Sequence, residues 1–224
     1  MSTASPEGEA ASRSLRPWFL VAAMILTWLV GVHGVMTGCG QLAYLRSGTM
    51  PDDSVALEQL RTASDPTAAL WEYAAVADNR ALAEHGRVML PVSIARALLS
   101  MLLVAASAML LAGRPGSRGF AIQVLVANAF FAVIAYAVTA EVRAQFVASM
   151  IRAARSVELP PNHPFAADES GASSAWFWAS RARLVVFDLG VLAVAGLAAA
   201  NRRTRVFVDA VARAERRRES EDEP

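Results

Sequence analysis

The chain has 224 residues, of which 55% are hydrophobic and only 18% charged, and its formal net charge is +1. Because soluble domains carry about 25% charged residues, this composition is typical of a membrane protein and leaves no room for a second, soluble domain. The near-zero net charge argues against a nucleic-acid partner, since phosphate binding needs a concentrated basic face. The single cysteine, Cys39, excludes an intramolecular disulfide and a cysteine-based zinc site. All 21 basic residues are arginine, a bias that we attribute to a GC-rich bacterial genome.

The N-terminal part predicts a tail and a first membrane span. Residues 1–16 are polar and small and lack periodicity, which is typical of a disordered cytoplasmic tail. The apolar run at about 18–38 exceeds the roughly 7–15-residue core of a cleaved signal peptide, so we expect a retained anchor. Its GxxxG pattern at Gly34 and Gly38 predicts close packing within the chain, with a homodimer seam as the alternative. The residues up to Cys39 resemble a loose bacterial lipobox, but we expect a free thiol there rather than a lipidated cysteine.

The first outer loop, residues 40–88, carries signals for two helices. Pro51 followed by two aspartates predicts one helix start, and Asp65 followed by Pro66 is an N-cap with proline at the first helical position of another. Leu70, with apolar residues at helical spacing after it and aromatic neighbours, makes a face wide enough to pack on the membrane or on the second outer loop. The loop therefore predicts a paired helical cap with a mildly acidic surface.

The second and third spans, about 89–112 and 120–140, are joined by a short loop that contains Arg114 and Arg118. Short loops obey the positive-inside rule best, so this loop is expected in the cytoplasm. Asn128 in the third span predicts an interhelical hydrogen bond.

Residues 141–182 form the second outer loop. The helical spacing of its apolar residues from Val142 to Ile151 predicts that the third helix projects beyond the bilayer and ends near Pro160. We expect an irregular return over Asp168–Ser174, followed by Trp176 and Trp178 at the outer interface.

The fourth span, about 184–200, leads into an arginine-rich tail, residues 201–224, with an acidic end. Phe207, Val211 and Ala214 lie on one helical face, which predicts that the fourth helix extends into the cytoplasm. Together these features predict an all-α, polytopic inner-membrane protein. We expect a four-helix transmembrane domain over residues 17–200, with helical extracytoplasmic loops and both termini cytoplasmic.

Four ionisable residues fall within the spans or at their borders: His33, Arg96, Arg183 and Asp188. Such groups cost about 2.5–3.5 kcal/mol at membrane depth, which makes each a candidate binding residue. A rise of about 1.5 Å per residue places all four in the outer half of the membrane. The favoured interpretation is structural: Arg96 pairs with Asp188 and fixes helix register, while the other two reach the interface. The functional interpretation is an outward-facing polar site that passes protons or holds an anionic head group.

No catalytic motif is present, and we expect neither a metal nor a cofactor. The sequence therefore predicts a non-enzymatic subunit or scaffold of a membrane complex. The lipid bilayer and a membrane-protein partner, or a second copy of the chain, would be its partners. A small transporter or ligand-binding membrane protein is the first alternative, and a membrane-embedded lipid-modifying enzyme is the second.

Overall fold

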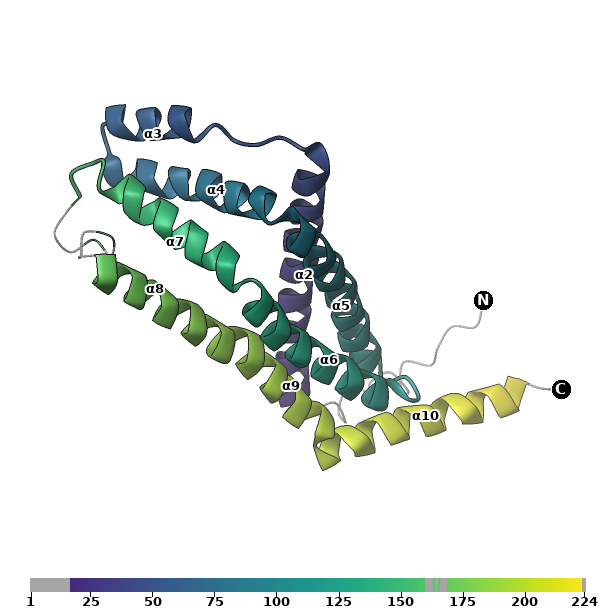
Figure 1. Ribbon diagram of the computed structural model, residues 1–224. Coiled ribbons are helices and arrows are strands. Elements are labelled where there is room, and N and C mark those ends of the chain that lie inside the picture. Colours follow the sequence, from purple (N-terminus) through teal and green to yellow (C-terminus); the bar gives the residue numbers. More distant parts are fainter. Residues whose placement is uncertain (1–16, 160–162, 164, 166–168, 223–224) are drawn as a thin grey trace. The chain divides into compact units, whose positions relative to one another are not determined.

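A computed structural model describes residues 17–159, 163, 165 and 169–222 of the chain (Figure 1). Over these residues the protein contains helices and no strands, so the predicted all-α fold is confirmed. Within the same part of the chain, four helical segments are long and apolar enough to cross a membrane. They are α2 (Trp18–Ser47), α5 (Gly86–Ala112), α6 (Ser117–Val138) and the continuous run of α8 (Glu169–Arg183), η1 (Leu184–Leu189) and α9 (Gly190–Ala200).

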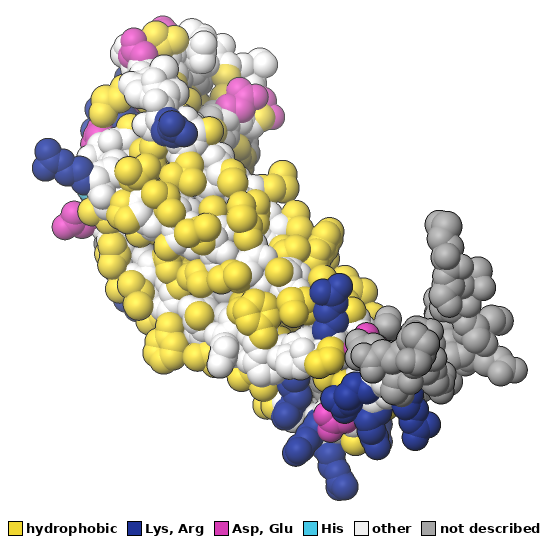
Figure 2. Space-filling model, turned by 90° about the vertical axis from the view of Figure 1, so that its right-hand side faces the viewer, with side chains coloured by type: hydrophobic (Ala, Val, Ile, Leu, Met, Phe, Trp, Pro, Cys, Tyr) yellow, Lys and Arg dark blue, Asp and Glu magenta, His cyan; other side chains and the backbone are white. Residues whose placement is uncertain are grey.

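The spans leave large apolar side chains exposed, as lipid contact requires. Ile134 on α6 and Leu197 on α9 are 57% and 73% exposed. Figure 2 shows hydrophobic side chains covering much of the face in view, with arginines gathered at its lower end. A soluble monomer rarely exposes an apolar surface of this extent. The chain is therefore a multi-pass membrane protein.

The chain divides into two compact units. Unit 1 comprises Met1–Met36, Arg96–Ala132 and Val186–Pro224, and unit 2 comprises Thr37–Ala95 and Val133–Val185.

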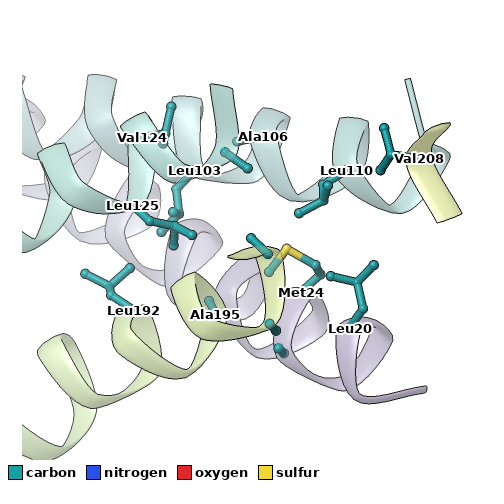
Figure 3. Packing of buried hydrophobic residues seen from close by; sticks show 14 of the residues in the cluster. Leu20, Met24, Leu103, Ala106, Leu110, Val124, Leu125, Leu192, Ala195 and Val208 are labelled. Carbon is teal, nitrogen blue, oxygen red and sulfur yellow. The ribbon is translucent and has the colours of Figure 1, made fainter. Parts of the chain in front are cut away.

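The core of unit 1 is an apolar cluster built from four helices and completed by a fifth (Figure 3). Alanines in this cluster allow close approach of the helices, as is usual in membrane bundles. The labelled members come from α2 (Leu20, Met24), α5 (Leu103, Ala106, Leu110), α6 (Val124, Leu125), α9 (Leu192, Ala195) and α10 (Val208).

Two glycines bring α2 against α5 within unit 1. A Cβ atom on Gly31 would lie 2.8 Å from Val104 Cγ2 and 3.1 Å from the Ser100 carbonyl oxygen. A Cβ atom on Gly34 would lie 2.2 Å from Ser100 Oγ. The predicted close packing within the chain is thus confirmed for Gly34. Gly31, one helical turn earlier, makes the same close approach to α5.

Helix α9 ends at Ala200, and α10 (Arg202–Asp222) is a separate helix. The predicted continuous extension of the fourth helix is therefore wrong. Asn201 has φ −58° and ψ 142°, which breaks the helix, and its Oδ1 accepts a hydrogen bond from the Arg203 backbone N–H at 2.9 Å. This is an N-cap. Phe207 is 1% exposed in the core of unit 1, whereas Ala214 is exposed, so the buried face of α10 differs from the predicted one.

Arg118 holds the end of α9. Its Nε donates to the Ala199 carbonyl at 2.9 Å and its Nη2 to the Ala200 carbonyl at 3.1 Å. The last carbonyls of a helix have no partner within it, and a cation there also meets the negative end of the helix dipole. One of the two arginines in the predicted cytoplasmic loop therefore has a structural role.

In unit 2, the two helix starts predicted in the first loop are confirmed. Helix α3 (Asp53–Thr62) is capped by Asp52, whose side chain accepts from the Ser54 N–H. Helix α4 (Pro66–Glu84) begins with its proline, and Asp65 caps it by accepting two backbone N–H bonds. Each cap satisfies donors that the first turn leaves free.

Helices α3, α4, α7 (Ala140–Ala154) and the start of α8 form what we name the cap, which has its own apolar core. Helix α4 packs on α7. Of the two predicted positions for the apolar face of the first loop, packing on the second loop is therefore confirmed. The buried members of the core are Leu60, Leu70, Tyr73, Ala77, Val147, Met150, Ile151, Ala153, Ala154, Phe165 and Ala172.

The return segment of the second outer loop is helical, contrary to the prediction. Helix α8 already begins at Glu169, so the expected irregular loop over Asp168–Ser174 is wrong from that residue on, while Asp168 lies outside the described residues. Ala172 is 2% exposed in the cap core, and that burial favours helix. Trp176 packs on Phe146 with ring centroids 5.2 Å apart, so it joins the cap core, whereas Trp178 is 67% exposed.

Candidate functional sites

The four predicted site residues fall in both units. His33 is exposed on α2, Arg96 is half-buried on α5, and Asp188 is half-buried in η1; all three belong to unit 1. Arg183 is exposed at the end of α8 and belongs to unit 2. The pairing of Arg96 with Asp188 stays a prediction.

Asp188 lies within a π-helical segment, Leu184–Leu189, in the middle of the fourth span. π-Helical turns are rare, and they occur often at functional sites because the wider turn changes the direction of side chains and backbone carbonyls. Apart from Asp188, the residues of this segment are as apolar as those of an ordinary span, so the local pattern does not predict a π-helix. Asp188 is therefore the best placed of the four residues for a binding role.

The cap contains a polar network that the sequence analysis missed. Tyr73 Oη donates to Asp53 Oδ1 at 2.6 Å, and Arg80 Nη1 lies 2.8 Å from Asp53 Oδ2. Arg80 Nε donates to Glu84 Oε1 at 2.8 Å, and Gln145 on α7 donates to the other oxygen of Glu84. The network thus joins α3, α4 and α7.

The network changes the acidity of its members. The hydrogen bonds from Arg80 and Gln145 lower the pKa of Glu84 below its usual value. Burial and the hydrogen bond to Asp53 raise the pKa of Tyr73 well above its usual value. Both groups keep one protonation state across neutral pH, which suits a structural role better than proton transfer.

His85 lies beside this network. Its Nδ1 lies 3.1 Å from the Ala81 carbonyl and its Nε2 lies 3.8 Å from Glu141 Oε2. An Nδ1–H donor to the carbonyl leaves Nε2 directed toward the carboxylate. Because the Glu141 side chain is 88% exposed, this contact is weak.

A cationic group lies in unit 2 where α6, α7 and α8 contribute side chains. The guanidinium carbon of Arg143 stands 3.7 Å from the centroid of the Tyr136 ring, and Arg143 Nη1 donates to Thr139 Oγ1 at 2.7 Å. The Tyr136 hydroxyl lies 3.2 Å from Ser180 Oγ. Arg181 is close enough to act electrostatically on the same hydroxyl. We name Tyr136, Arg143, Ser180 and Arg181 the arginine–tyrosine group.

An apolar groove of about 270 Å³ lies in unit 1. It is lined by Ala23 and Leu26 of α2, by Val186 of η1, and by Gly190, Val191 and Val194 of α9. These side chains offer no group for acid–base or nucleophilic chemistry.

Within the described residues, His, Cys, Asp and Glu nowhere gather in a group of three or more that could hold a metal ion. Comparison with protein-family models, with curated proteins and with solved structures finds no match. The fold itself defines the class, a multi-pass helical membrane protein with a helical cap.

Proposed function

We propose that this protein is a non-enzymatic subunit or scaffold of a membrane complex, and that the cap is its docking module. The observation that carries the proposal is the construction of the cap. Helices α3 and α4 of the cap have side-chain N-caps, and the module has a shared apolar core and a polar network across three helices. A surface that is ordered before binding loses less conformational entropy when a partner docks.

The exposed face of α3 and α4 indicates the chemistry of that partner. Trp71 and Val55 are each 53% exposed, and tryptophan is the residue type most enriched among interface hot spots. Exposed acids surround them in sequence, namely Glu58, Asp65 and Glu72. A partner with an apolar centre and a basic rim would complement this face.

We propose further that the protein lies in a bacterial inner membrane with both termini in the cytoplasm. The arginines of the 113–119 loop and of α10 support this orientation through the positive-inside rule. Reporter enzymes fused after residue 224 and within the first outer loop test it. Activity of a cytoplasmic reporter in the loop would contradict the orientation.

Extraction of the tagged protein in mild detergent, followed by native mass measurement and protein identification, tests the scaffold function. We expect stoichiometric partners with the native chain and their loss with Trp71→Arg. Trp18→Arg is the matched control, because Trp18 is 80% exposed and lies in unit 1, remote in sequence from the cap. A bare monomer from native membrane, or equal loss with both variants, would contradict docking through the cap.

The π-helical segment favours a second candidate function, a ligand-binding or transport protein with Asp188 in its site. We expect Asp188→Asn to abolish binding while the protein stays folded. A double-mutant cycle with Arg96→Ala and Asp188→Ala tests their pairing, for which we expect a coupling energy of about 0.5–3 kcal/mol. Additive losses would mean that the two side chains do not interact.

A further inference from the structure

The arginine–tyrosine group is not used by either candidate function, and it holds a partly desolvated cation. Arg143 stacks on Tyr136 and donates a hydrogen bond to Thr139 Oγ1. Its Nε is buried without a hydrogen-bond partner. Burial lowers the pKa of the guanidinium below its ordinary value, and Tyr136 offsets only part of this effect. A buried donor without a partner destabilises the protein, and more so when the donor is charged.

A second cation completes the group. Arg181 is exposed, and its guanidinium carbon lies 5.5 Å from the centroid of the Trp178 ring. Since both arginines act on the Tyr136 hydroxyl, two positive charges and two hydroxyl groups, those of Tyr136 and Ser180, converge on one place in unit 2. Guanidinium groups and hydroxyls are the donors that bind phosphate oxygens.

The surrounding residues place this group at the edge of the lipid-facing surface. On α6, Val133, Ile134 and Val138 lie around Tyr136 in sequence and are 48%, 57% and 48% exposed, as expected where side chains contact acyl chains. Arg143 follows them on α7, and Trp178 and Arg181 lie on α8 shortly before the exposed Val185 of η1. Arginine, tyrosine and tryptophan concentrate at the level of lipid head groups. A phospholipid in the adjacent leaflet presents its phosphate at this level.

We propose that the arginine–tyrosine group binds the phosphate of an anionic phospholipid. Arg143 and Arg181 supply the charge, and the hydroxyls of Tyr136 and Ser180 supply additional donors. Two cations in one group favour a lipid with net negative charge, such as phosphatidylglycerol, over the zwitterionic phosphatidylcholine.

The test uses the full-length protein in nanodiscs of phosphatidylcholine with increasing fractions of phosphatidylglycerol, with retained lipid measured by native mass spectrometry. We expect selective retention of phosphatidylglycerol and about a tenfold weaker affinity for Arg181→Gln, the size of one lost charge-assisted hydrogen bond. Arg181 is exposed, so this variant should fold. Arg143→Gln should weaken binding by at least as much, and Tyr136→Phe by less, because it keeps the ring.

Arg46→Gln is the matched control, since Arg46 is an exposed arginine of the same unit at the end of α2. It removes the same charge and should leave retention unchanged. Equal retention of both lipids, or equal loss with Arg46→Gln and Arg181→Gln, would overturn the proposal.

A parallel arm adds inorganic phosphate to the protein in phosphatidylcholine nanodiscs and follows binding by phosphorus NMR. Inorganic phosphate presents anionic oxygens without acyl chains, so the lipid proposal predicts no binding that depends on Arg181. Binding that depends on Arg181, together with loss of the preference for phosphatidylglycerol, would overturn the lipid as the source of the phosphate.

Discussion

The core of unit 1 and the cap of unit 2 both bury apolar clusters, but they treat their polar side chains differently. In unit 1, Thr27 and Ser107 each donate to a carbonyl four residues earlier in their own helix. In the cap, Asp53 and Glu84 bond to side chains of other helices. A polar side chain in lipid needs a hydrogen-bond partner even before its helix packs on another, and a bond to the carbonyl of its own helix supplies one in unit 1. In water, charged side chains can instead bond to other helices and so determine which helices pair.

Asn128 of unit 1 combines a local bond with an interhelical one. Its Nδ2 donates to the Val124 carbonyl of its own helix at 2.9 Å and to the Leu99 carbonyl of α5 at 3.2 Å. The interhelical hydrogen bond predicted for this residue is thus confirmed, with a local bond beside it. Asn128 therefore keeps a bond within its own helix while it also reaches across to α5.

The largest effect should come from the cap core. Met150 is 0% exposed, and Met150→Ala should destabilise the cap by about 2–5 kcal/mol because it leaves a cavity. Hydrogen exchange should accelerate in α3, α4 and α7 and remain unchanged in the unit 1 parts of α5 and α6. Met150→Leu, which nearly conserves volume, is the control and should cost less than about 1.5 kcal/mol. Equal acceleration of hydrogen exchange in both units would show that the cap core does not stabilise the cap separately from unit 1.

The next effect should come from the α2–α5 contact in unit 1. Gly31→Ala places a Cβ atom 3.1 Å from the Ser100 carbonyl oxygen and should cost about 1–3 kcal/mol through overpacking. Gly40→Ala on the same helix is the control, because nothing lies within 4 Å of the added Cβ. That variant should be neutral or stabilising, since alanine favours helix. Thermal unfolding in detergent measures both, and equal melting temperatures would contradict the close approach.

A smaller effect on the free energy of unfolding should distinguish two tyrosines of unit 2, Tyr73 and Tyr44. Tyr73→Phe removes the hydrogen bond to Asp53 and should cost about 0.5–1.5 kcal/mol. Tyr44→Phe removes a buried hydroxyl that has no hydrogen-bond partner, so it should cost nothing or stabilise. The free energy of unfolding of the two variants provides the measurement. A loss at Tyr44 equal to that at Tyr73 would show that the network contributes nothing specific.

The smallest effect should be a dependence of cap stability on pH. The pKa of Glu84 is lower in the folded protein than the value of about 4.3 expected when unfolded. Its contribution is therefore present above that value and lost as the pH falls through the folded pKa. Hydrogen exchange in α4 and α7 should accelerate in this acidic range, and less so in Glu84→Gln. The amides of the unit 1 core should show no such change.

The sequence predicts those features that depend on residues close together along the chain, and misses those that depend on contacts between distant residues. The caps at Asp52 and Asp65 and the apolar spans are local, so the residues themselves specify them. The cap network depends on the packing of α3, α4 and α7, which no local pattern encodes. The break at Asn201 is stabilised by burial of Phe207, a contact with residues far along the chain. Likewise, the stacking of Arg143 on Tyr136 follows from the short interruption at Thr139 between α6 and α7.

The burial of α10 in the core of unit 1 also affects synthesis of the protein. Phe207 and Val208 complete the same cluster that Leu20 and Met24 begin, so the first and last helices of the unit share one core. Contacts so distant in sequence form slowly, and a ribosome delivers Leu20 long before Phe207. Until then, the cluster lacks the side chains that α10 contributes. Unit 1 therefore completes its packing only after translation has passed Val208.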